Sequence, residues 1–98
     1  MKTIKLEGAF KRDFEEYLRK RYFDIIDIFY SLPYSAQYGI FEDFGDSVGK
    51  RISIFPLIIR GVIIYEIFIN ESHKGDYGTR HEARQAAVLK LISLYNES

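Results

Sequence analysis

Apolar side chains recur every three or four residues over residues 9–22, which predicts an amphipathic helix. Its apolar face comprises Phe10, Phe14, Tyr17, Leu18 and Tyr22. Charged residues fill most of the remaining positions, as expected for a helix with one solvated face. Residues 22–30 fit two interpretations, a continuation of this helix or a short extended segment rich in β-branched isoleucine. The pattern leaves both open.

A second helix is predicted over residues 34–48, where apolar residues again recur at helical spacing. Ser31 is a good N-cap residue and Pro33 is favoured in a first helical turn, so a helix start is expected here. Gly49 can end the helix in the left-handed conformation. A strand over residues 38–41 is the alternative, although the acidic pair that follows is unfavourable in a strand.

Residues 51–59 and 62–70 predict two strands joined by a tight turn at Arg60-Gly61, because both segments are rich in Ile, Val, Phe and Tyr. Glycine in such a turn can adopt a positive φ. Pro56 has no amide hydrogen to donate, so the first strand should lie at a sheet edge.

Both faces of this hairpin are apolar, whereas a sheet with one wet face alternates apolar and polar residues. Either helices cover both faces, or a second subunit buries one of them. Three helices are few for double coverage, so we favour a homo-oligomer or a complex with another protein. The candidate interface consists of Phe55, Leu57, Ile59, Ile64 and Phe68.

Residues 70–78 predict a polar loop, and the last helix begins after it. Thr79 and Glu82 have the spacing of a capping box, in which the hydroxyl and the carboxylate each satisfy a free backbone amide. The predicted fold is α+β, a single domain over residues 1–98 with helices packed on a hairpin or short antiparallel sheet. The expected element order is α-α-β-β-α, with α-β-β-β-α as the alternative.

The composition narrows the class of protein. Ninety-eight residues make one domain, and the absence of cysteine excludes disulfide scaffolds, thiol nucleophiles and redox centres. Eight Tyr and eight Phe exclude intrinsic disorder. The chain shows neither a secretory signal nor an apolar run long enough to span a membrane, so a cytoplasmic location is expected.

Catalytic and metal-binding patterns are weak. His73 and His81 are eight residues apart, one in a predicted loop and one at a helix start, so no metal site is expected from them. The chain has no phosphate-binding glycine loop and no nucleophile elbow, so we expect a non-enzyme without a catalytic site, cofactor or small-molecule substrate. An enzyme would need a pocket that unites a histidine with Asp43 or Asp46.

Five acidic residues could pair for acid–base chemistry or hold Mg²⁺, although a solvated acidic face is the simpler interpretation. They are Asp24, Asp27, Glu42, Asp43 and Asp46, and they make residues 22–49 strongly acidic. The whole chain has 14 basic and 14 acidic residues and a formal net charge of zero. This balance argues against a strongly basic nucleic-acid-binding protein, yet both ends of the chain carry a basic excess.

Three segments resemble a group of small uncharacterised proteins encoded by phages and mobile elements of gut anaerobes. They read SLPYSAQYG (residues 31–39), DFGDSVG (residues 43–49) and TRHEARQAA (residues 79–87). Gly45 stands where an aromatic residue is expected, and Ala36 where a larger apolar residue is expected. The resemblance implies a phage or prophage context, with no established activity. Because the hairpin is apolar on both faces and catalytic patterns are absent, a phage or mobile-element accessory protein that acts through protein–protein contacts is the leading functional expectation.

Residues 75–92 are similar to the final helix of double-stranded-RNA-binding domains. In that family a glycine-containing loop precedes a hydroxyl residue, basic residues and alanines, and the basic side chains contact phosphates. The matching positions here are Thr79, Arg80, His81 and Arg84. The resemblance implies a weak nucleic-acid-binding module as the alternative function, with Arg19, Lys20, Lys50 and Arg51 as possible helpers. The chain lacks the family's Gly-Pro-x-His element between its first strands.

Overall fold

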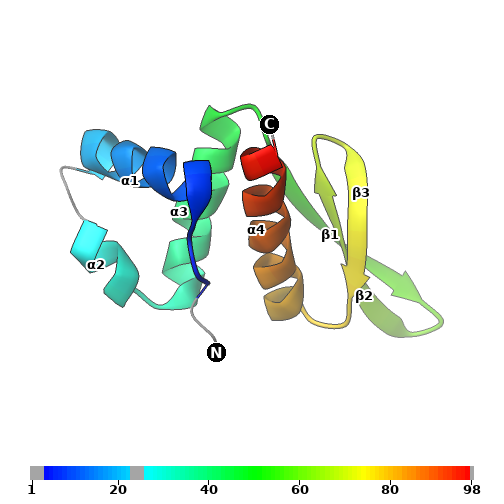
Figure 1. Cartoon of the computed structure of the whole chain (residues 1–98). Coiled ribbons are helices and arrows are strands. Elements are labelled where there is room, and N and C mark those ends of the chain that lie inside the picture. Colours follow the sequence, from blue (N-terminus) through cyan, green and yellow to red (C-terminus); the bar gives the residue numbers. More distant parts are fainter. Residues whose placement is uncertain (1–3, 23–25, 98) are drawn as a thin grey trace.

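The structure is a computed structural model that describes residues 4–22 and 26–97 (Figure 1). The elements are α1 (Gly8–Tyr22), α2 (Ile26–Ser31), α3 (Tyr34–Ser47), β1 (Ile52–Ile59), β2 (Val62–Ile69), β3 (Ser72–Tyr77) and α4 (Arg80–Glu97). The α+β class is confirmed. The expected order α-α-β-β-α was short by one helix and one strand, and the last five elements follow the alternative order α-β-β-β-α.

The helices lie where they were predicted, but the N-cap assigned to Ser31 was wrong. Helices α1 and α3 occupy the predicted ranges, so residues 38–41 are helical rather than extended. The ambiguous segment forms α2 from residue 26, and residues 23–25 lie outside the described residues. Ser31 does not cap α3, because its hydroxyl donates a hydrogen bond to the Ile28 carbonyl (2.7 Å) and so closes α2. Pro33 holds the N-cap position of α3 without a side-chain hydrogen bond.

The predicted polar loop over residues 70–78 was wrong, because residues 72–77 form β3. The three strands are antiparallel in the order β1-β2-β3, so β2 is central and the other two are edges. Backbone pairing with β2 holds β3 in the sheet although its sequence is polar. Pro56 lies on edge strand β1, as predicted.

Both hairpin turns are two-residue turns in which both central residues have positive φ. The first turn has Arg60 at φ 51° and Gly61 at φ 79°, and the second has Asn70 at φ 52° and Glu71 at φ 70°. This is the signature of type I′ turns, whose twist matches that of the flanking strands. Glycine and asparagine tolerate this conformation, whereas Glu71 adopts it at an energetic cost.

Helix α4 is the centre of the molecule. It lies between the sheet on one side and the group formed by α1, α2 and α3 on the other (Figure 1). Its fully buried residues are small or branched, and include Ala83, Ala87, Val88 and Leu91. The alanines allow α4 to approach its neighbours closely.

Aromatic rings fill the space among the first three helices. The ring of Phe14 is stacked on Phe41 at 4.8 Å and meets Phe29 and Phe44 edge-on at 5.0 and 5.3 Å. All the described helices lie on one side of the sheet (Figure 1). The sequence left open whether helices cover both faces of the hairpin. The described helices cover only one face of the sheet, and none of them packs on the other.

Candidate interaction surface

The five predicted interface residues lie on one face of the sheet. In the β1–β2 register Leu57 pairs with Ile64 and Ser53 with Phe68, and paired residues share a face. The opposite face packs on α4, where Ile67 and Ile69 are buried. We define the open face as the apolar residues that point away from α4, namely Phe55, Leu57, Ile59, Val62, Ile64 and Phe68.

The open face is apolar and accessible. Phe55 is 54% exposed and Val62 61% exposed, while Ile64 and Phe68 are half-buried among their neighbours. The rings of Phe55 and Phe68 meet edge-on at 5.7 Å, which fixes one end of this surface. Contiguous apolar surface of this kind marks interaction sites on folded proteins.

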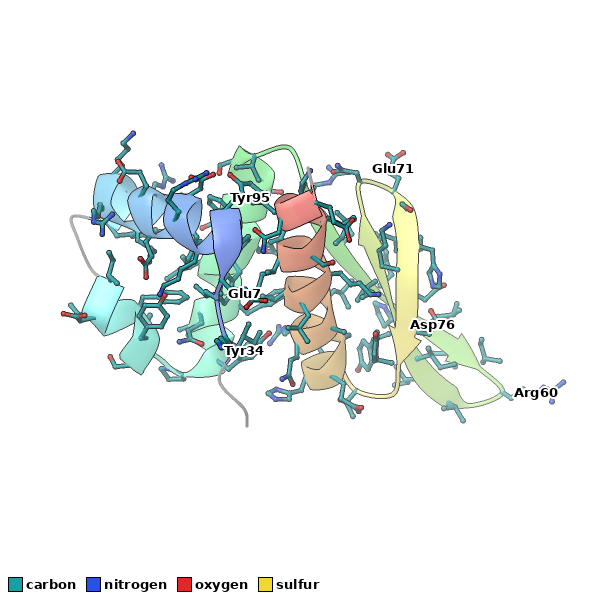
Figure 2. The ribbon with its side chains drawn as sticks, viewed as in Figure 1. Glu7, Tyr34, Arg60, Glu71, Asp76 and Tyr95 are labelled. Atoms are coloured by element: carbon teal, nitrogen blue, oxygen red, sulfur yellow. The ribbon has the colours of Figure 1, made fainter. Side chains whose placement is uncertain are left out.

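The hairpin tip extends beyond α4, so it is uncovered on both faces. Ile58 and Ile63 belong to the helix-facing side of the register, yet they are 70% and 47% exposed. Arg60 lies at the turn and points away from the rest of the molecule (Figure 2). The tip therefore combines exposed aliphatic side chains with one basic residue.

Three polar side chains of β2 and β3 lie within or next to the open face, around the Phe55–Phe68 pair. Glu66 lies within the open face, on β2 and opposite Phe55. Phe68 pairs with His73 and Glu66 with Asp76, so His73 and Asp76 flank this face on β3. His73 Nε2 is 2.7 Å from Asp76 Oδ1 and 3.8 Å from Glu66 Oε2. This cluster could not be predicted from the sequence, because residues 70–78 were expected to form a loop.

The residues of the RNA-binding resemblance lie together at the start of α4, where aromatic rings hold their side chains. The Arg80 guanidinium lies 5.5 Å from the centre of the Tyr65 ring, and His81 meets the ring of Tyr34 at 5.7 Å. Both Arg80 and His81 are exposed. Cation–π contact orients an arginine without occupying its hydrogen-bond donors.

Half of the predicted capping box is present. The backbone amide of Glu82 donates to the Thr79 hydroxyl at 3.1 Å, as the box requires. The Glu82 carboxylate was expected to accept from the backbone amide of Thr79, but it accepts from the Thr79 hydroxyl at 2.9 Å instead. The cap therefore uses the hydroxyl as both acceptor and donor.

An open hollow of about 200 Å³ lies between α3 and the start of α4, lined by Tyr38, Glu42, Ile54, Arg80 and Arg84. The Arg84 guanidinium lies 5.3 Å from the centre of the Tyr38 ring. The Tyr38 hydroxyl donates to Glu42 at 3.2 Å, and burial, followed by the Glu42 charge, raises the pKa of Tyr38. The Glu42 carboxylate disfavours an anion inside this hollow.

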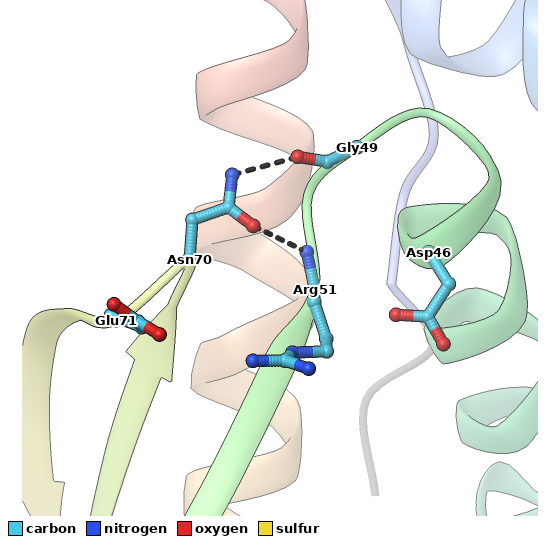
Figure 3. A pocket seen from close by; sticks show the side chains of 5 residues that line it. All are labelled: Asp46, Gly49, Arg51, Asn70 and Glu71. Atoms are coloured by element: carbon cyan, nitrogen blue, oxygen red, sulfur yellow. Dashed lines mark hydrogen bonds between the residues drawn. The ribbon is translucent and has the colours of Figure 1, made fainter.

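The further basic residues suggested for nucleic-acid binding lie outside the start of α4. Arg19 and Lys20 approach Glu16 within 3.4 and 3.6 Å on α1. Arg51 lines an open hollow of about 370 Å³ together with Asp46 and three further residues of the chain (Figure 3).

The side chain of Asn70 fastens one wall of that hollow. Its amide group donates to the Gly49 carbonyl at 2.7 Å and accepts from the Arg51 backbone amide at 2.9 Å (Figure 3). This clamp joins the β2–β3 turn to the segment that leads from α3 into β1. The hollow is lined by both acidic and basic side chains. The hydrogen bonds of Asn70 give its residues a structural role.

Asp43 and Asp46 are the two acidic residues of which an enzyme would need one next to a histidine. Asp43 and Asp46 line an open hollow together with Tyr17 and Arg21, and neither histidine lines it. Asp27 is exposed on α2, and Asp24 lies outside the described residues.

None of the helices within residues 4–22 and 26–97 combines the length and the apolar character that a membrane span requires. Comparison of the chain with protein-family models, with curated proteins and with solved structures gave no match.

Proposed function

We propose that this protein is a non-enzymatic module that associates with a second copy of itself through the open face. The observation that supports the proposal is a sheet face on which large apolar side chains lie uncovered, next to a hairpin tip that none of the helices within residues 4–22 and 26–97 covers. Their exposed area is on the order of several hundred Å², the size at which surface patches usually bind something. A standard interface buries about 800 Å² on each partner, so this face supplies much of the area required.

The charges along the open face favour a second copy as the partner. Arg60 lies at the tip, and the carboxylates of Glu66 and Asp76 lie in the row next to the Leu57–Ile64 pair, on its side away from the tip. When two copies stack with antiparallel strands and a two-fold axis at the Leu57–Ile64 pair, each basic tip lies opposite the carboxylates of the other copy. Both charged groups are two or three residues from this axis, about 7–10 Å along the strands.

The apolar residues also match across such an axis. Phe55 lies two positions to one side of the Leu57–Ile64 pair, and the Ile59–Val62 pair lies two positions to the other. Each phenylalanine ring would therefore face two smaller aliphatic side chains of the second copy. Sheets that pack face to face are about 10 Å apart, which leaves room for this interdigitation. The zero net charge of the chain adds no long-range repulsion.

Sedimentation equilibrium over a series of protein concentrations tests the proposal. The wild-type protein should dimerise, and Leu57→Glu should be monomeric because it places two carboxylates next to the symmetry axis. Ile28→Glu is the matched control, since Ile28 is 58% exposed on α2, away from the sheet. A wild-type monomer at high micromolar concentration, or equal effects of the two variants, would contradict the proposal. Circular dichroism verifies that both variants are folded.

The three motif segments support a phage or mobile-element context for such a module, with the host cytoplasm as its place of action. An accessory protein of this kind would act through protein–protein contacts, and its dimer could present further surfaces to a second partner. The genes that neighbour its coding sequence test this context, because structural genes favour a virion role and replication genes favour a role near nucleic acid.

A second candidate function is weak binding of duplex RNA or DNA by the start of α4. It is supported by the exposed Arg80 and His81 next to Thr79 and Arg84, together with the α-β-β-β-α order of the last five elements. So few phosphate contacts would give low affinity that falls steeply with salt.

Fluorescence anisotropy with labelled duplexes at low salt tests this candidate. Arg80→Glu combined with Arg84→Glu should abolish binding, whereas Lys90→Glu is the control because Lys90 is exposed further along the same helix. Equal binding by the double variant and the wild type would contradict it.

A further inference from the structure

We propose that Glu66, His73 and Asp76 form a binding site for a divalent transition metal ion of the zinc class. The three side chains come from the neighbouring strands β2 and β3, and their potential ligand atoms all lie within 4.8 Å of one another. An imidazole nitrogen and two carboxylate oxygens are ligands that zinc accepts. The site goes beyond the proposed self-association and does not depend on it.

The spacing of these atoms is close to what a metal ion needs. Ligand atoms about 2.1 Å from a tetrahedral zinc ion are about 3.4 Å from one another. His73 Nε2 is 2.7 Å from Asp76 Oδ1 and 3.8 Å from Glu66 Oε2, so the pairs bracket that separation. Side-chain movements of less than about 1 Å would place all three on one ion, with the fourth position open to water.

A β-bulge brings two of the three ligands to the same face. In a regular strand, residues three apart point to opposite faces, so His73 and Asp76 would diverge. The register shifts between Ile67 and Phe68, because Phe68 pairs with His73 and Ile67 with Gly75, which leaves one extra residue in β3. Bulges re-aim side chains in this way and are frequent beside functional sites.

Gly75 makes this bulge possible. Its φ is 144°, in the region that other residues rarely adopt, and a Cβ atom there would lie 3.1 Å from the ring of Tyr77. The backbone conformation therefore favours glycine, and the space next to Tyr77 is tight for a larger residue. The result is a histidine and an aspartate held together by the strand geometry.

Neighbouring rings and the charge balance favour a cation here. The His73 ring meets the Phe68 ring edge-on at 5.4 Å, which limits how the imidazole can turn. Two carboxylates face one imidazole, so the cluster carries a net negative charge. Asp76 lies on the exposed edge strand, where a metal ion can enter from solvent (Figure 2).

Competition between the protein and a chromophoric zinc indicator tests the site. Zinc should bind at one ion per chain, and His73→Ala should weaken binding at least tenfold because it removes the nitrogen ligand. His81→Ala is the matched control, since His81 is also exposed and lies on the first turn of α4. Magnesium in place of zinc should not bind measurably, because it prefers an all-oxygen octahedral site.

Two results would overturn the site: the absence of saturable zinc binding by the wild type, or equal losses in His73→Ala and His81→Ala. Side-chain NMR of the two histidines gives a second readout, in which zinc should shift the resonances of His73 and leave those of His81 in place. Leu57→Glu should still bind zinc at one ion per chain and no more weakly than the wild type, so failure of the proposed dimer and failure of the metal site are distinguishable.

Discussion

The side chain of Asn96 caps helix α1, whose first residues lie almost the whole chain away in sequence. Asn96 Oδ1 accepts a hydrogen bond from the Phe10 amide at 2.8 Å, and its Nδ2 donates to the Glu7 carbonyl at 3.1 Å. Gly8, with φ 68°, passes so close that a Cβ atom there would lie 3.0 Å from this side chain. The last turn of α4 therefore supplies the N-terminal cap of α1.

Asn96→Ala should lower the free energy of unfolding by about 1 kcal/mol, because the Phe10 amide loses its partner. Urea denaturation followed by circular dichroism measures the change. Ser93→Ala is the control, since its hydroxyl makes an exposed hydrogen bond to Glu97 within the same helix. Equal effects of the two substitutions would show that the cap contributes nothing.

Two glycines of α3 should respond in opposite directions to replacement by alanine. Gly39 has no heavy atom within 4 Å of the position a Cβ would take, so Gly39→Ala should stabilise the protein by about 1 kcal/mol through helix propensity. A Cβ on Gly45 would lie 2.6 Å from the Lys50 carbonyl oxygen, so Gly45→Ala should destabilise by about 1–3 kcal/mol. Thermal unfolding of both variants checks the sign, and a stabilising Gly45→Ala would refute this explanation of the glycine.

Glu71→Gly should stabilise the protein by about 1 kcal/mol or more, because it removes a glutamate from the left-handed region and creates the Asn-Gly pair that type I′ turns favour. Gly61→Ala, in the other hairpin turn at φ 79°, should be destabilising. Urea denaturation midpoints measure both changes. A destabilised Glu71→Gly would indicate that the carboxylate makes a favourable contact.

Tyr34→Phe should leave stability unchanged or raise it by up to about 1 kcal/mol. The Tyr34 hydroxyl is buried with no hydrogen-bond partner in the described structure, and burial raises its pKa. Removing an unsatisfied buried group saves its desolvation cost. Tyr38→Phe is the comparison, since that hydroxyl donates to Glu42 and its loss should be destabilising. Denaturant unfolding ranks the two variants, and a larger loss for Tyr34→Phe would contradict the prediction.

Zinc should weaken dimerisation about two- to thirtyfold if both the proposed dimer and the proposed metal site exist. An exposed ion pair contributes about 0.2–1 kcal/mol, and two symmetric pairs with Arg60 would be lost when the metal ion cancels the negative charge facing them. Sedimentation equilibrium with and without zinc measures the shift. Arg60→Ala should dimerise more weakly and respond little to zinc, and an unchanged response in this variant would contradict the pairing.

The periodic spacing of apolar residues predicted the helices and the first hairpin well, because these segments place apolar residues at regular helix or strand intervals. It failed for β3, whose residues alternate neither in size nor in polarity. That strand is held by backbone hydrogen bonds to β2, and backbone pairing leaves little trace in an edge strand's sequence. The misassigned cap at Ser31 has a similar origin, because a serine between two helices can close one or open the next.

The candidate interface could be predicted from the sequence of the hairpin, because both of its faces are apolar and the few predicted helices could not cover both. The histidine–carboxylate cluster could not be read in this way. His73 and Asp76 share a face because one bulge changes the alternation between them, and the position of a bulge depends on pairing with the neighbouring strand. The glycine at position 75 is the local trace of this geometry.

The position of α4 has a consequence for how the chain is made. Every other element precedes α4 in sequence, yet both the sheet and the helical group bury their apolar faces against it. During synthesis, the three helices and the isoleucine-rich hairpin leave the ribosome before α4. The apolar surfaces that they will bury against α4 stay exposed to water until α4 is made. Such intermediates are prone to aggregate. Nascent chains stalled before α4 should therefore depend on chaperones more than the released protein does.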